Sequence, residues 1–154
     1  MVRNSGIILG IFLLNLLTAS AETVTRVHDG DSFHVAEFKK EVRLFGVDAP
    51  EVSSPPGVRG KHQGQPLAIE SRDYLRTLIL GKQVSLQCPH TKSHQRPVCK
   101  VFTGNIDIAA EMVKKGWAYD EPHFTVEYRT QENLAKQNGL GVWSLPNGGV
   151  RPWD

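Results

Sequence analysis

Short stretches of alternating side chains, each bounded by turn residues, are the feature that most constrains the fold of this chain. Three of them lie in the first 50 residues, and two more follow a long helical pattern. Strands this short, separated by turns and accompanied by helices, predict a small closed or partly closed β-barrel of the α+β class. The expected strands are Thr23–His28, Ser32–Ala36, Glu41–Val47, Gln83–Cys88 and Val98–Phe102.

Three helices are expected beside these strands. The first covers Leu67–Leu80, where apolar residues recur at helical spacing, Pro66 lies near the first turn and Gly81 follows the end. Asp107 is placed to cap a second helix that runs through Lys115, and Thr125 to cap a third that runs through about Asn138. The tail Pro146–Asp154 is expected to be frayed surface.

The N-terminus has the pattern of a secretory signal. Arg3 precedes an uncharged stretch with an apolar centre at Ile7–Leu17, and Ala19-Ser20-Ala21 forms a small-x-small cleavage motif. A retained membrane anchor is the alternative, but the apolar centre is shorter than the roughly 20 residues that a spanning helix needs. We expect residues 1–21 to be removed and residues 22–154 to form one domain that is secreted or periplasmic.

Net charge does not by itself argue for a polyanionic partner. The chain has 18 lysine and arginine side chains against 16 acidic ones, and one of the 18 is Arg3 in the expected signal. Local distribution is more informative, because Arg59, Lys61 and His62 lie in a glycine-rich loop before Pro66. This loop either contacts phosphates or is an ordinary solvated loop.

The segment from Arg43 to Glu51 gathers charged groups at the end of a strand. It reads Arg43-Leu-Phe-Gly-Val-Asp48-Ala-Pro-Glu51, and a second acidic turn, Asp29-Gly30-Asp31-Ser32, precedes it. Two aspartates on separate turns can meet around one hard cation. Together the two segments indicate a metal-assisted phosphodiesterase.

Each requirement of phosphodiester hydrolysis has a candidate residue. Asp31 and Asp48 supply hard oxygen ligands for Ca²⁺, and the main-chain carbonyl of Ala49 could be a third ligand. Glu51 could act as general base toward water. Two arginines can donate paired N–H groups to phosphoryl oxygens, a geometry that lysine cannot reproduce; they are Arg43 and Arg96.

Taken singly, these residues also have structural interpretations. Asp29-Gly30-Asp31 is a common turn, Arg43 could pair with Glu41 or Glu51 on a solvated strand face, and Glu51 could be a surface carboxylate. Their occurrence together and in order favours the catalytic interpretation.

Four ordered motifs resemble those of the staphylococcal nuclease family. They are Asp29-Gly-Asp31-Ser, Val42-Arg43-Leu-x-Gly-Val-Asp48-Ala-Pro-Glu51, Gln95-Arg96-Pro-Val-Cys-Lys-Val and Val113-Lys-Lys-Gly116-Trp-Ala. The resemblance covers about Thr23 to Trp143. It implies a five-stranded OB-fold barrel flanked by three helices, and a Ca²⁺-dependent endonuclease that cleaves DNA and RNA to leave 3′-phosphate ends.

By this resemblance, the family's catalytic positions fall on Arg43, Glu51 and Arg96, and its calcium ligands on Asp31, Asp48 and the Ala49 carbonyl. The chain departs from the family before Arg96, where Asp-x-Tyr-Gly-Arg is common and this sequence reads Lys92-Ser93-His94-Gln95-Arg96. His94 could stack or donate in place of the tyrosine. A monomer is the default expectation.

Two cysteines lie on consecutive expected strands. In an exported protein Cys88 and Cys99 most simply form one disulfide across a hairpin. The alternative is a metal site with His90 and His94, although the spacing does not follow a usual zinc-finger pattern.

Aromatic residues after the second helix could stack bases or pack the core; they are Trp117, Tyr119, Phe124 and Tyr128. Two other classes of function remain beside the nuclease. One is an OB-fold nucleic-acid-binding module without catalysis, and the other is an exported structural or adhesion domain, which leaves the acid and arginine pattern unexplained.

Overall fold

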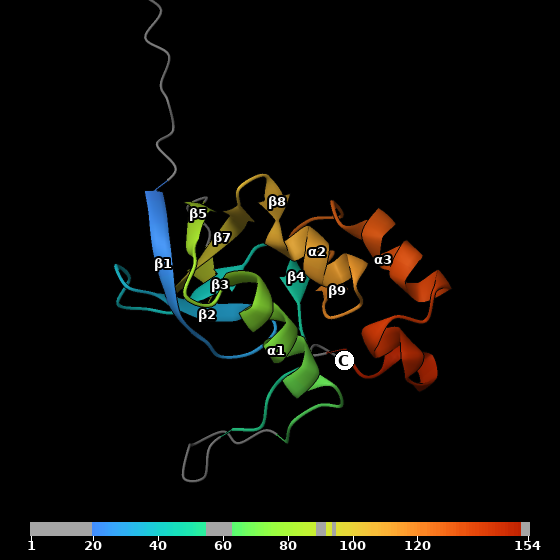
Figure 1. The fold of residues 1–154 in the computed structure, drawn as a ribbon. Coiled ribbons are helices and arrows are strands. Elements are labelled where there is room, and N and C mark those ends of the chain that lie inside the picture. Colours follow the sequence, from blue (N-terminus) through green and yellow to red (C-terminus); the bar gives the residue numbers. More distant parts are fainter. Residues whose placement is uncertain (1–19, 55–62, 89–91, 94, 152–154) are drawn as a thin grey trace, which may run out of the picture.

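The computed structural model describes residues 20–54, 63–88, 92–93 and 95–151 (Figure 1). Three sequence predictions fall wholly or partly outside these residues: the signal segment before Ser20, the basic loop residues Arg59, Lys61 and His62, and the histidines His90 and His94. Among the described residues, no helix has the length and apolar character needed to cross a membrane.

Five strands form a ring that closes on itself. Their order is β3-β2-β1-β5-β7, and β7 pairs again with β3. The closing β3–β7 pair is parallel, whereas the other neighbours are antiparallel. This ring confirms the expected five-stranded barrel. The strands are β1 (Ser20–Val27), β2 (Ser32–Val35), β3 (Val42–Leu44), β5 (Gln83–Gln87) and β7 (Arg96–Thr103).

Four two-residue strands complete the sheets. The strands β6 (Lys92–Ser93) and β8 (Ile106–Asp107) pair with β7, whereas β4 (Val47–Asp48) and β9 (Tyr119–Asp120) form a separate antiparallel pair.

Helices cover the ring as expected. They are α1 (Ala68–Ile79), α2 (Ile108–Lys114) and α3 (Arg129–Gln137), followed by the 3₁₀ turns η1 (Gly141–Ser144) and η2 (Pro146–Gly148). Figure 1 shows α1 beside the ring, and α2 and α3 together on the side away from β1. Helix α1 contacts both β1 and α2. The core lies between the ring and these helices and includes Phe33, Leu44, Leu75, Ile79 and Met112, all at most 1% exposed.

The expected strand Glu41–Val47 is broken in the structure. Gly46 has φ +75°, and a Cβ at this position would lie 2.4 Å from Thr125 Cγ2. A side chain here would be strained by the backbone conformation and would also collide with Thr125. The turn directs the chain out of β3 and into β4, where Asp48 faces Tyr119 of β9. After this turn, Asp48 of β4 lies in contact with Arg43 of β3.

One helix cap was predicted correctly and one was not. The Asp107 side chain accepts a hydrogen bond from Ala110 N at 3.1 Å, as expected of an N-cap. Thr125 does not cap α3, because its hydroxyl accepts from Glu127 N at 3.1 Å and the helix begins only at Arg129. This local hydrogen bond forms a turn that precedes the helix.

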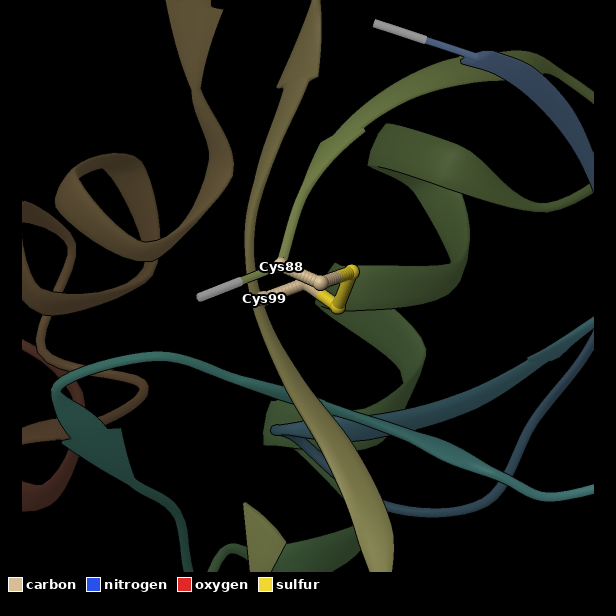
Figure 2. The surroundings of a disulfide bond; sticks show 2 residues. All are labelled: Cys88 and Cys99. Atoms are coloured by element: carbon tan, nitrogen blue, oxygen red, sulfur yellow. A yellow bond between two sulfur atoms is a disulfide. The ribbon is translucent and has the colours of Figure 1, made fainter. Parts of the chain in front are cut away.

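The expected disulfide is present. Cys88 follows β5 and Cys99 lies within β7, with their Cα atoms 4.1 Å apart, and Figure 2 shows the bridge between the two segments. Both cysteines are consumed in it, so the alternative of a zinc site built on their thiolates is excluded.

Two ends of the domain differ from expectation. The described part of the tail is not frayed, because Tyr119 Oη donates to Gly148 O at 2.9 Å and Arg151 Nη2 lies 2.9 Å from Glu132 Oε1. At the other end, β1 begins at Ser20, and Ser20 and Ala21 already pair with β5. Cleavage after Ala21, which stays a prediction, would therefore leave a chain that starts inside β1.

Candidate active site

Arg43 lies between two aspartates that come from different turns. Its Nη1 donates to Asp31 Oδ1 at 3.3 Å, its Nη2 lies 3.1 Å from Asp31 Oδ2, and the same nitrogen makes a close contact with Asp48 Oδ1. The Arg43 side chain is 13% exposed, which rules out a solvated strand face. Because Ser32 of β2 pairs with Arg43 of β3, the preceding residue, Asp31, comes beside the guanidinium.

The turn that carries Asp31 is tightly packed. Asp31 N donates to Asp29 Oδ1 at 3.0 Å, which closes the acidic turn locally. A Cβ on Gly30 would lie 1.9 Å from Ser71 Oγ of α1 and 2.7 Å from Ala49 Cβ. Glycine at position 30 therefore allows the helix and the segment after β4 to pack directly against the turn.

Asp31 is held by donors in addition to Arg43. Ser32 Oγ donates to Asp31 Oδ1 at 2.6 Å, and Ala49 N donates to Asp31 Oδ2 at 3.1 Å. Burial alone would raise the pKa of Asp31, but the guanidinium of Arg43 and these hydrogen bonds lower it below its usual value. Asp31 is therefore a fixed, buried anion.

Asp48 and Asp29 experience the opposite shift. Burial and the charge of Asp31 raise the pKa of Asp48 to about 8. Burial, followed by the charge of Asp31, also raises the pKa of Asp29, and the charge of Glu51 adds to this effect. One guanidinium does not fully balance the acidic groups gathered here.

This cluster fits a hard cation. Asp31 and Asp48 offer carboxylate oxygens at one point, and Ala49, whose N–H already binds Asp31, places its main chain beside them. In the described part of the chain, no group of three or more His, Cys, Asp or Glu side chains is arranged to hold a metal ion. The protein side chains that meet here are the two carboxylates of Asp31 and Asp48, and the calcium ligand set expected from the sequence stays a prediction.

Glu51 follows this cluster and is anchored through its main chain. Glu51 N donates to Gln65 Oε1 at 2.8 Å, and Gln65 N donates to Glu51 O at 2.9 Å. The side chain is half-buried. Gln65 thus holds the main chain of Glu51, a contact that the sequence did not reveal, because a glutamine in a loop carries no local signal for it.

Arg96 does not join the Arg43 cluster. Its Nη1 donates to Glu41 Oε2 at 3.3 Å, and Glu41 Oε1 lies 3.3 Å from His28 Nδ1 and 3.7 Å from His34 Nε2. The parallel β3–β7 register pairs Arg43 with Val98, so the positions two residues earlier, Glu41 and Arg96, are also neighbours. The structure thus assigns Glu41 to Arg96, whereas the structural interpretation of the sequence had paired it with Arg43.

The aromatic residues divide between core and surface. Tyr119 and Tyr128 are 1% exposed, and Trp117 packs against the core. Phe124 is 41% exposed and makes an edge-to-face contact with Phe45, with ring centroids 6.3 Å apart. Packing therefore accounts for the two tyrosines, and only Phe124 remains largely accessible among these four.

Comparisons with known proteins identify sequences that are similar to this chain. A family model described as Staphylococcal nuclease homologue matches residues 41–145. Probable endonuclease LCL3 from Podospora anserina is 31% identical over 82% of this chain and 58% of that protein. The proteins of the same name from Komagataella phaffii and Candida dubliniensis are 31% and 34% identical, over 81% and 79% of this chain and 69% and 65% of theirs. The chain therefore spans 58 to 69% of the length of these relatives.

Proposed function

Because the chain belongs to the family of staphylococcal nuclease homologues, we propose that it is a Ca²⁺-dependent endonuclease that hydrolyses the phosphodiester bonds of DNA and RNA. The observation that carries the proposal is the cluster in which Arg43 contacts both Asp31 and Asp48. Glu51 follows Asp48 by three residues. The names of the fungal relatives support the same activity.

Arg43 and Arg96 bind the phosphate in this proposal. Each guanidinium presents paired N–H groups to the non-bridging oxygens, where charge increases as the water attacks. The two arginines reach the phosphate from neighbouring strands, since β3 and β7 are paired. Glu41 holds Arg96 until a phosphate is bound.

Glu51 accepts the proton of the attacking water. Its backbone is fixed by the two hydrogen bonds to Gln65, so the carboxylate is presented from a defined position. A carboxylate that removes a proton in the transition state contributes about 10²- to 10⁴-fold to the rate.

Asp31, Asp48 and the carbonyl of Ala49 would hold the Ca²⁺ ion. When bound, such an ion neutralises phosphate charge and makes an attached water more acidic. With the two carboxylates neutralised in this way, Arg43 can direct its N–H groups to the substrate. The donor set supports this role because both carboxylates are at most 8% exposed and already share one positive group.

Little sequence preference is expected, because the residues of this site address phosphate rather than base edges. The family resemblance leads us to propose 3′-phosphate products. We also propose that residues 1–21 direct export to the periplasm or the medium, where an oxidising environment suits the Cys88–Cys99 disulfide.

The test is cleavage of single-stranded DNA, duplex DNA and RNA with calcium and with a chelator, alongside Glu51→Gln. Glutamine keeps the size of the side chain and removes the base, so we expect calcium-dependent cleavage that falls by about 10²-fold or more in the variant. Nucleic-acid binding without cleavage under all metals tested would instead support the non-catalytic OB-fold module.

A further inference from the structure

A basic pocket opens between β1, α1 and the segment that follows Glu51. Its volume is about 340 Å³, and its basic lining residues are Arg26, His28, Arg72 and Arg76. Arg72 and Arg76 lie one turn apart on α1, and Arg26 comes from β1. Among the described residues that line the pocket, none is acidic.

The positive charge in this pocket is only partly balanced. Arg72 donates to the exposed Asp73 at 2.8 Å, and His28 lies near Glu41. Within the described part of the chain, neither Arg26 nor Arg76 forms an ion pair. Like charges one turn apart on a helix repel each other, so this arrangement favours a bound anion.

Two connections link the pocket to the candidate active site. Ser53 lines the pocket and is two residues beyond Glu51, which limits the separation of their Cα atoms to about 7 Å. On the other side, His28 lines the pocket and contacts Glu41, the ion-pair partner of Arg96. A strand whose scissile phosphate lies between Arg43 and Arg96 can therefore continue into this pocket.

We infer that this pocket binds a backbone phosphate of the substrate strand, next to the bond that is cleaved. The inference rests on the proposed nuclease function and adds a subsite to it. Guanidinium groups from two elements, together with the hydroxyl of Ser53, provide the donors that a phosphodiester oxygen accepts. Because these groups touch only the backbone, the subsite reads no sequence.

The experiment compares two double variants that each remove two positive charges. Arg26→Gln/Arg76→Gln changes the pocket, and Lys114→Gln/Lys115→Gln changes the exposed end of α2, outside the pocket. Cleavage of a single-stranded 12-mer is followed at several salt concentrations. In parallel, its binding is measured in a Glu51→Gln background, and thermal unfolding verifies that each protein is folded.

We expect the pocket variant to raise KM and the dissociation constant about tenfold while kcat stays near the wild-type value. The slope of log affinity against log salt should fall by about 0.7 for each phosphate that the variant no longer neutralises. The control variant should change KM, the dissociation constant and the salt slope much less. A dinucleotide substrate is too short to reach the pocket, so the wild-type protein and both double variants should cleave it equally.

Other outcomes overturn one proposal or both. Equal KM and equal salt slopes for the two double variants, with normal wild-type cleavage, would overturn the phosphate subsite alone. A pocket variant that alters inhibition by inorganic phosphate but not oligonucleotide binding would show a site for free anions and would also overturn it. Binding without cleavage would overturn the proposed function, while the binding comparison would still decide the subsite.

Discussion

Reduction of the disulfide between Cys88 and Cys99 should lower the free energy of unfolding by about 3 kcal/mol. The two cysteines are 11 residues apart in sequence. For a closed loop of that length the chain-entropy relation gives about 9 cal/mol/K, or about 3 kcal/mol near room temperature. Since small domains are stable by about 5–15 kcal/mol, this is a large share of the total.

The loss should come from the unfolded state rather than from the folded site. Cys99 is 0% exposed, and its main-chain carbonyl accepts from Phe45 N at 2.9 Å, a hydrogen bond that does not depend on the sulfur. A free cysteine also packs as a small apolar residue. Activity well below the unfolding transition should therefore change little, while the denaturation midpoint falls.

Urea unfolding followed by tryptophan fluorescence, with and without dithiothreitol, measures this effect. The double variant Cys88→Ala/Cys99→Ala is the control, because its midpoint should be independent of reductant. Thiol titration must show two free thiols in the reduced sample. Identical midpoints and slopes for the oxidised and fully reduced protein would refute the argument.

Three further changes test the packing and charge of the site. Gly30→Ala should cost about 1–3 kcal/mol, measured by urea unfolding, and should reduce cleavage, because its Cβ would collide with Ser71 Oγ. Asp107→Ala removes the acceptor of both the α2 cap and the Tyr128 hydroxyl at 3.1 Å, so thermal unfolding should show a loss of about 1–3 kcal/mol. Arg43→Gln leaves two buried carboxylates without their guanidinium and should cost about 3–5 kcal/mol. In the Arg43→Gln variant, calcium should raise the free energy of unfolding more than it does in the wild-type protein. An equal calcium-induced increase in the two proteins would contradict the metal site.

Local patterns in the sequence were sufficient to place most elements. The helix predicted at Leu67–Leu80 is observed at Ala68–Ile79, and the Asp107 cap is present, because both depend on residues a few positions apart. The errors have long-range causes. Gly46 breaks the third strand because Thr125, distant in the sequence, packs against it and β9 pairs with the chain beyond it.

The residues of the candidate site could be selected from the sequence more easily than the residues that contact them. Arg43, Asp48 and Glu51 lie in one short segment, so their types and spacing were visible directly. Their contacts were not, since Gln65 reaches Glu51 across 14 positions and Glu41 reaches Arg96 across 55. No local period connects such positions, and only the register of the ring brings them together.

Closure of the ring explains why the charged groups meet where they do. Strand β3 has three residues and pairs with β2 on one side and β7 on the other. The antiparallel partner brings Asp31 to Arg43, and the parallel partner brings Arg96 beside Glu41. Parallel pairing requires a long connection, here the chain that contains α1 and β5, so a hairpin alone could not place the strand of Arg96 beside the strand of Arg43. The geometry of the site is therefore a property of the closed ring, and any change that opens the β3–β7 pair should separate Arg43 from Arg96 before it disturbs the acidic turn.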